Sequence, residues 1–294
     1  MLIDIHVHTT RIRNLSRPNG NRFPDPGELI AVLDAHGIDR AVVLSGVSPE
    51  CRYCFVTPED VADICAEYPQ RLIPFFNLDS RMLLNNQKSN FRPLLQAYVD
   101  MGFRGIGEYM PNIPFDDPLN LNLFRQVEEA GLPLIFHLAS AIGGQYGCYD
   151  ELGLPRLENV LSQCPNLMLL GHSQPFWAEI STDVTEQNRG GYPTGPVQPG
   201  RVVHLMREHP NLYGDLSAGS GFNAISRDPA FGYEFMEEFQ DRLLFGTDIA
   251  NLNQDLPIVP YFRTLKTEKL ISEQAYDKIT WRNADRLLRL GISP

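Results

Sequence analysis

The sequence predicts an α/β fold, a (β/α)₈ TIM barrel that residues 1–294 form as a single domain. Eight short apolar segments alternate along the chain with segments that carry helix start and stop signals, a pattern typical of repeated β/α units. No glycine-rich dinucleotide-binding turn follows the first strand, which favours a closed barrel over an open doubly wound sheet. The length agrees, because barrels of this size are routinely one domain.

The predicted strands are short runs rich in aliphatic and aromatic residues. They cover residues 2–7, 40–46, 71–78, 103–109, 133–139, 167–172, 212–217 and 242–248. Helix boundaries are clearest at 25–37, 57–69, 117–131 and 283–291. The first of these helices is predicted to be capped by Asp25 and to stop at Gly37. Residues 173–200 form an extended loop rich in glycine, proline and glutamine, and loops this long are often lids or specificity elements.

Composition excludes several classes of function. Acidic residues outnumber basic ones by 36 to 25, and the net charge of −11 argues against a nucleic-acid partner. Neither a signal peptide nor an apolar run long enough to span a bilayer is visible. Five cysteines, an odd number, favour reduced thiols in a cytoplasmic protein. We interpret Cys51 and Cys54 as loop thiols rather than a zinc site, because no second pair completes four ligands.

Histidine and acidic side chains stand at the ends of the predicted strands. His6 and His8 share one face of the first strand because strand side chains alternate, which puts Ile5 and Val7 on the other face. Four further candidates lie near the ends of other strands: Glu108, His137, His172 and Asp248. A lone strand histidine is usually a core residue, but four of the seven histidines lie at strand ends, which a barrel gathers around one cavity. This set predicts a divalent metal, with Zn²⁺ first and Mn²⁺ or Fe²⁺ as alternatives.

These residues and their order resemble the amidohydrolase superfamily. Within it, the chain resembles the amidohydrolase-related family, which includes aminocarboxymuconate semialdehyde decarboxylase, γ-resorcylate decarboxylase and dicarboxylate lactonases. The resemblance spans nearly the whole chain, with DIHVHT at the first strand, FH at the fifth, GH at the sixth, LLFGTD at the eighth and NADRLL in the final helix. It implies a barrel of the metal-dependent hydrolase type.

The resemblance also implies roles for the strand-end residues. The ligands of a first metal would be His6, His8, His137 and Asp248. Asp248 would also be catalytic, accepting a proton from the attacking water, and His172 would be an acid–base residue or a ligand to a second metal. Glu108 departs from the decarboxylase-like members and resembles the bridging ligand of binuclear relatives such as the TatD-like enzymes. Its alternative is an ion-paired carboxylate, so one or two ions per chain are expected.

The leading functional hypothesis is a hydrolase that uses metal-activated water on a small amide, ester or lactone. A non-oxidative decarboxylase on the same scaffold is the nearest alternative. A phosphoesterase of the polymerase-and-histidinol-phosphatase type shares the DIHVHTT-like start, but Arg11 stands where that family continues with a Ser-Asp-Gly-like element. A barrel that only binds ligands would be expected to have lost a metal ligand, and none of the expected set is missing.

Residues that follow the strands are candidates for binding the substrate. The loop of residues 11–22 carries no acidic residue and four arginines, Arg11, Arg13, Arg17 and Arg22, so one or two of them could hold a substrate carboxylate. The other candidates are Tyr109, Trp177, Asn223 and Arg227. We expect a small-molecule substrate and no membrane partner. Barrels of this type often pair, which is compatible with a homodimer.

Overall fold

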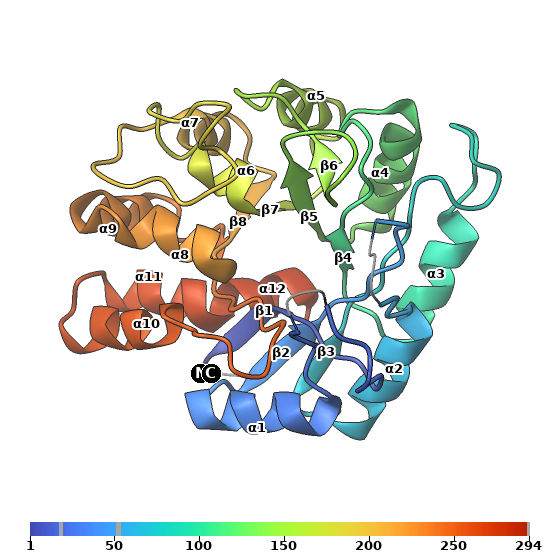
Figure 1. The fold of residues 1–294 in the computed structure, drawn as a ribbon, viewed down its shortest axis with the longest axis horizontal. Coiled ribbons are helices and arrows are strands. Elements are labelled where there is room, and N and C mark those ends of the chain that lie inside the picture. The colour runs from blue at the N-terminus through green and yellow to red at the C-terminus, as the bar shows by residue number, and fades with distance from the viewer. Residues whose placement is uncertain (18–19, 51–53, 293–294) are drawn as a thin grey trace.

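A computed structural model describes residues 1–17, 20–50 and 54–292. The predicted thiol Cys51 lies outside the described residues, and Cys54 carries a free thiol. The fold is the predicted (β/α)₈ barrel, with the strands inside and the helices around them (Figure 1). Among the described residues, no helix is both long and apolar enough to cross a membrane.

All eight predicted strands are present and parallel. They are β1 (Ile3–Val7), β2 (Arg40–Val43), β3 (Leu72–Pro74), β4 (Ile106–Tyr109), β5 (Leu134–Ala139), β7 (Leu169–His172), β8 (Leu212–Asp215) and β9 (Leu243–Leu244). A further two-residue strand, β6 (Cys148–Tyr149), pairs with the end of β5. It belongs to the loop that follows β5.

Two runs of strands, β1-β2-β3 and β4-β5-β7-β8-β9, join into one ring. A parallel bridge between Phe76 and Ile106 links β3 to β4, and a second between Val7 and Ile249 links β1 to the segment after β9. The amide of His8 donates to the carbonyl of Ile249 at 2.8 Å across this second junction. The first and last strands are therefore neighbours.

The helices cover the outside of the ring. They are α1 (Pro26–His36), α2 (Pro58–Glu67), α3 (Arg92–Asp100), α4 (Pro118–Ala130), α5 (Pro155–Gln163), α6 (Gln174–Ala178), α7 (Arg201–Glu208), α8 (Ala218–Ser226), α9 (Pro229–Glu238), α10 (Ile258–Thr267), α11 (Glu273–Asp277), the π-helical turn η1 (Lys278–Arg282) and α12 (Asn283–Leu288). The predicted boundaries of α1 are confirmed, since Asp25 accepts a hydrogen bond from the amide of Glu28 and Gly37 has a φ of 65°.

Strict alternation in β1 is a prediction that the structure corrects. Ile5 packs inside the barrel with Val42 and Leu170, whereas Val7 packs in the layer beneath the helices. The pairing register with β2 shifts between Asp4 and Val7, which is the signature of a bulge. The bulge allows Ile5 and His6 to point inward together.

Candidate metal centre

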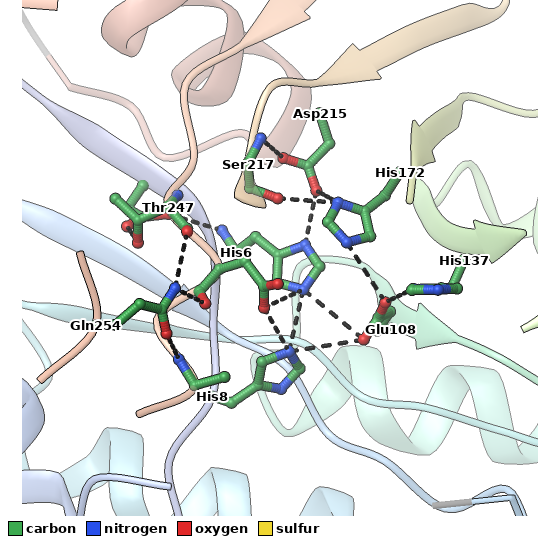
Figure 2. Close-up of polar contacts among 12 residues, drawn as sticks. His6, His8, Glu108, His137, His172, Asp215, Ser217, Thr247 and Gln254 are labelled. Carbon is green, nitrogen blue, oxygen red and sulfur yellow. Dashed lines mark hydrogen bonds and ion pairs between the residues drawn. The ribbon is translucent and has the colours of Figure 1, made fainter. Parts of the chain in front are cut away.

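Six strand-end side chains converge at the carboxyl end of the barrel (Figure 2). They are His6, Glu108, His137, His172, Asp215 and Asp248, with His8 beside them. Because parallel strands of a barrel all end on the same side, residues separated by large stretches of sequence meet here. The donor atoms form three overlapping groups, and one of them, His6, His172 and Asp215, shares its histidines with the other two.

The first group contains His6, His8 and Asp248. Nε2 of His6 lies 3.1 Å from Nε2 of His8, and Oδ1 of Asp248 lies 3.6 and 3.3 Å from these two atoms. Ligands of a tetrahedral zinc ion sit at its corners about 3.3 Å apart, given ligand distances of about 2.0–2.2 Å. Oε2 of Glu108 lies 3.8 and 3.6 Å from the same imidazole nitrogens. The residues present therefore fit a divalent metal.

The second group contains Glu108, His137 and His172. Oε1 of Glu108 lies 2.6 Å from Nδ1 of His137 and 3.8 Å from Nε2 of His172. The resemblance assigned His137 to the same ion as His6 and His8, but the geometry groups it with Glu108 and His172. Glu108 thus presents one oxygen to each group, and its Oε1 is hydrogen-bonded to Nδ1 of His137.

Asp215 is a buried carboxylate that the sequence analysis did not single out. Its Oδ2 accepts from Nδ1 of His6 at 2.7 Å and lies 3.3 Å from Nδ1 of His172. Ser217 Oγ also lies 3.0 Å from that nitrogen of His172. Carboxylates in this position fix the ring orientation and tautomer of metal-binding histidines. The available signal was its place at the end of an apolar strand, LYGD, which it shares with the other site residues.

Charges in the site compensate one another. Burial alone would raise the pKa of Glu108, but the imidazoles of His137, His6 and His172 hold it well below its usual range. Burial likewise opposes the charge on His6, yet the Asp215 carboxylate raises the His6 pKa to about 10. A proton on His6 thus balances the Asp215 carboxylate, whereas burial lowers the pKa of His137. Because metal ligands must be deprotonated, a bound cation would displace such protons.

Side chains that donate to backbone carbonyls hold Glu108 and Asp248 in place. The side-chain amide of Asn77 donates to the carbonyl of Glu108 and, at 3.2 Å, to that of Ser45. Gln254 donates to the carbonyl of Asp248 at 2.7 Å. Asp248 has a φ of 55°, an uncommon left-handed conformation for a residue with a side chain. These contacts turn both carboxylates toward the cavity.

A cavity of about 540 Å³ opens above the donor groups, and His8, Glu108, His137, His172 and Asp248 form part of its wall. Most of the remaining lining is apolar and includes Leu15, Phe23, Leu44, Val56, Met110 and Leu138. Its size suits a small molecule.

Two of the predicted substrate contacts, Arg17 and Arg22, are among the described residues that line the cavity. The other candidates are not in its wall: Arg11, Arg13, Tyr109, Trp177, Asn223 and Arg227. Arg11 pairs with Glu67 and Arg13 with Asp25, and both guanidinium groups are largely exposed. Asn223 lies in α8, away from the cavity wall. Arg11 and Arg13 thus face solvent and the acidic side chains with which they pair.

Three other candidates have structural partners. The Tyr109 hydroxyl is buried and donates to Asn120 at 2.6 Å. The indole of Trp177 donates to the carbonyl of Asp215 at 2.8 Å and so supports the site from behind. One Arg227 nitrogen lies 3.4 Å from Asp183.

Known proteins resemble this chain in sequence and in fold. A family model described as amidohydrolase matches residues 3–290. No match was found among curated proteins. The fold is similar to an uncharacterised TIM-barrel protein from Bordetella bronchiseptica, with a TM-score of 0.68, 20% identity and 98% of each chain covered.

Two further solved structures are similar over comparable lengths. A probable 2-pyrone-4,6-dicarboxylic acid hydrolase from Acinetobacter baumannii has a TM-score of 0.59 and 15% identity, covering 98% of this chain and 99% of that one. A dihydroxybenzoic acid decarboxylase from Polaromonas, with bound manganese, has a TM-score of 0.59 and 17% identity, covering 99% and 98%. The family match spans nearly the whole sequence, and the chain therefore belongs to the amidohydrolase family.

Proposed function

We propose that the protein is a hydrolase of a small ester, lactone or amide that works with two divalent metal ions. The observation that carries this proposal is the position of Glu108, whose two oxygens face separate donor groups. Two-ion sites are common in enzymes that activate water for attack on a carbonyl or phosphoryl group. The family match and the mostly apolar cavity support a small organic substrate.

The side chains of the site would transfer protons and orient the reacting groups. A bound divalent cation would lower the pKa of water from about 15.7 toward 7, which makes hydroxide available near neutral pH. Asp248 lines the cavity and would accept the proton from the attacking water and pass it to the leaving group. His172, whose Nδ1 is held by Asp215 and Ser217, would present Nε2 to the substrate carbonyl or to the second ion.

Non-oxidative decarboxylation is the second candidate, supported by the similarity to the dihydroxybenzoic acid decarboxylase. Release of carbon dioxide from a panel of aromatic acids, with no turnover of esters or lactones, would favour it. The phosphoesterase alternative has no such support and would need turnover of a generic phosphate ester.

Metal content per chain, measured by plasma mass spectrometry, tests the proposal. Wild type is expected to hold close to two equivalents, and Glu108→Gln close to one, because an amide cannot bridge two ions as a carboxylate does. Glu128→Gln, a change at a half-buried side chain of α4 outside the donor groups, is the control and should match wild type. One equivalent in all three proteins would remove Glu108 from the ligand set and favour decarboxylation. The same spectra distinguish Zn²⁺, our first expectation, from Mn²⁺ and Fe²⁺.

A further inference from the structure

Two buried residues of the strand-end motifs take no part in the proposed chemistry. Asp4 begins the DIHVHT motif, and Thr247 precedes Asp248 in LLFGTD. Asp4 is fully buried, Thr247 is almost as buried, and neither lines the cavity. Burial of a carboxylate costs free energy, so the hydrogen bonds that Asp4 accepts must compensate for the loss of water.

Asp4 joins the first strand to the segment that carries Asp248. Its Oδ1 accepts hydrogen bonds from the backbone amides of His6 and Thr247, each at 3.0 Å. Its Oδ2 accepts from the hydroxyl of Thr247. One carboxylate thus holds the backbone of His6 and that of the residue before Asp248, and these two candidate ligands come from opposite ends of the chain.

The backbone of Asp248 is fixed by its surroundings. Its amide donates to the carbonyl of His6 at 2.9 Å, and its carbonyl accepts from Gln254 at 2.7 Å. On the preceding side, a Cβ on Gly246 would lie 2.9 Å from Oδ1 of Asp215, so this segment lies tightly against the end of β8. The left-handed conformation of Asp248, with a φ of 55°, is therefore held in place by its neighbours.

We propose that Asp4 is a positioning residue, which sets the spacing between His6 and Asp248 before an ion binds and so raises the affinity of the first donor group for a divalent cation. Ligands that are already held in place lose little conformational freedom when an ion binds, and this preorganisation increases affinity. The inference rests on the proposed two-ion centre only for the number of ions.

The effect should be confined to the first donor group. In Figure 2, Thr247 and Gln254 lie on one side of His6, and Glu108 lies on the other. The contacts of Asp4 involve only the backbone of the first strand and the side chain and backbone of Thr247. Changes at Asp4 should therefore weaken binding of one ion and leave the ion of the second donor group in place.

Variants of the Asp4–Thr247 contact separate geometry from charge. Asp4→Ala removes both acceptor atoms, and Thr247→Val removes the hydroxyl with little change of shape. Titration of the metal-free protein with Co²⁺ against a competing chelator should show one of two ions bound about tenfold or more weakly in both variants. Asp4→Asn keeps an oxygen for the two amides and gains an NH₂ group that can donate to the Thr247 hydroxyl, so its affinity should stay close to that of wild type.

The visible absorption spectrum of bound Co²⁺ is the second measurement, because it depends on the number and geometry of the ligands. The spectrum should change in Asp4→Ala and Thr247→Val but not in Asp4→Asn. Thr280→Val is the matched control, since Thr280 is also fully buried and its hydroxyl donates to the carbonyl of Tyr276 at 2.7 Å, outside the donor groups. It should lose stability in a urea titration and still bind Co²⁺ as wild type does.

The outcomes distinguish this inference from the proposed function. Wild-type affinities and spectra in Asp4→Ala and Thr247→Val would refute the positioning role, and so would an equal loss in Asp4→Asn, which would assign the effect to charge. If Asp4→Ala does not fold, Thr247→Val decides the comparison. If wild type binds one ion only, the two-ion hydrolase proposal fails, and the same comparison on that ion decides the role of Asp4.

Discussion

Nδ1 of His6 donates a hydrogen bond to Oδ2 of Asp215 at 2.7 Å, and both side chains are fully buried. The bond fixes the ring of His6 so that Nε2 faces His8 and the cavity. A carboxylate behind a metal-binding histidine orients the ring and makes it a better ligand. Asp215 would therefore act on a bound ion through His6 and His172.

Replacement of Asp215 by Asn should weaken metal binding without removing a ligand. We expect the affinity for Zn²⁺ to fall about 10- to 100-fold, since outer carboxylates contribute that much in other sites. Titration against a competing chelator measures the change. Asp100→Asn, an exposed carboxylate at the end of α3, should have no effect. Equal affinity in Asp215→Asn and wild type would show that His6 needs no such partner.

Alanine substitutions at two glycines in the loop after β5 distinguish the effect of backbone strain from the effect of contact with His137. A Cβ on Gly147 would lie 2.7 Å from Cδ2 of His137, whereas a Cβ on Gly143 would meet nothing within 4 Å. Both residues have positive φ, at 104° and 83°, so alanine should cost each about 1–3 kcal/mol of stability. Only Gly147→Ala should also lower the metal content and the activity. Identical metal content in both variants would exclude contact between this loop and the second donor group.

The extended loop is anchored by a buried ion pair. Arg189 is fully buried, donates to Glu179 at 2.9 Å and to the carbonyl of Asp150 at 3.0 Å, and precedes Gly190 in the cavity wall. At pH 8, where Glu179 is ionised, Arg189→Met should lower the free energy of unfolding by about 3–5 kcal/mol, because it leaves a buried carboxylate unpaired. Arg207→Met breaks an exposed pair with Glu238 and should cost about 1 kcal/mol or less. Urea titration measures both, and similar losses would contradict the anchoring role.

Stability should depend on pH through Glu179. Burial raises the pKa of its carboxyl to about 7, although Arg189 opposes the shift. The folded chain therefore binds this proton more tightly than the unfolded chain, so the stabilisation is complete below about pH 4.5 and is lost as the pH rises through about 7. Thermal unfolding of wild type between pH 5 and 8 should show Tm falling through this window, more steeply than in Glu179→Gln. Parallel curves for the two proteins would mean that Glu179 stays ionised throughout.

The barrel was predictable because its evidence is local. Each strand is an apolar run of the right length, and caps such as Asp25 and Gly37 mark helix ends in the sequence itself. The positions of His137 and Glu108 at strand ends were equally visible. The assignment of these residues to separate donor groups was not visible in the sequence, because it depends on where each strand ends around the ring.

Contacts that depend on how loops and layers pack could not be predicted from the sequence. Trp177 and Tyr109 follow strand ends, as substrate contacts often do, but both turn into the core and hydrogen-bond there. In the sequence, Asp215 cannot be distinguished from other carboxylates at strand ends, because its contact with His6 exists only in the folded chain. The bulge in β1 also has no marker, because its sequence fits regular alternation as well.

The junction between Val7 and Ile249 has a consequence for how the protein matures. His6 and His8 leave the ribosome among the first residues of this sequence, whereas Asp248 leaves it near the end. A nascent chain cannot assemble the first donor group until its last strand has emerged and docked beside its first. Binding of a metal at the first donor group should therefore follow synthesis of the chain. A bound ion would then indicate that the ring of strands has closed.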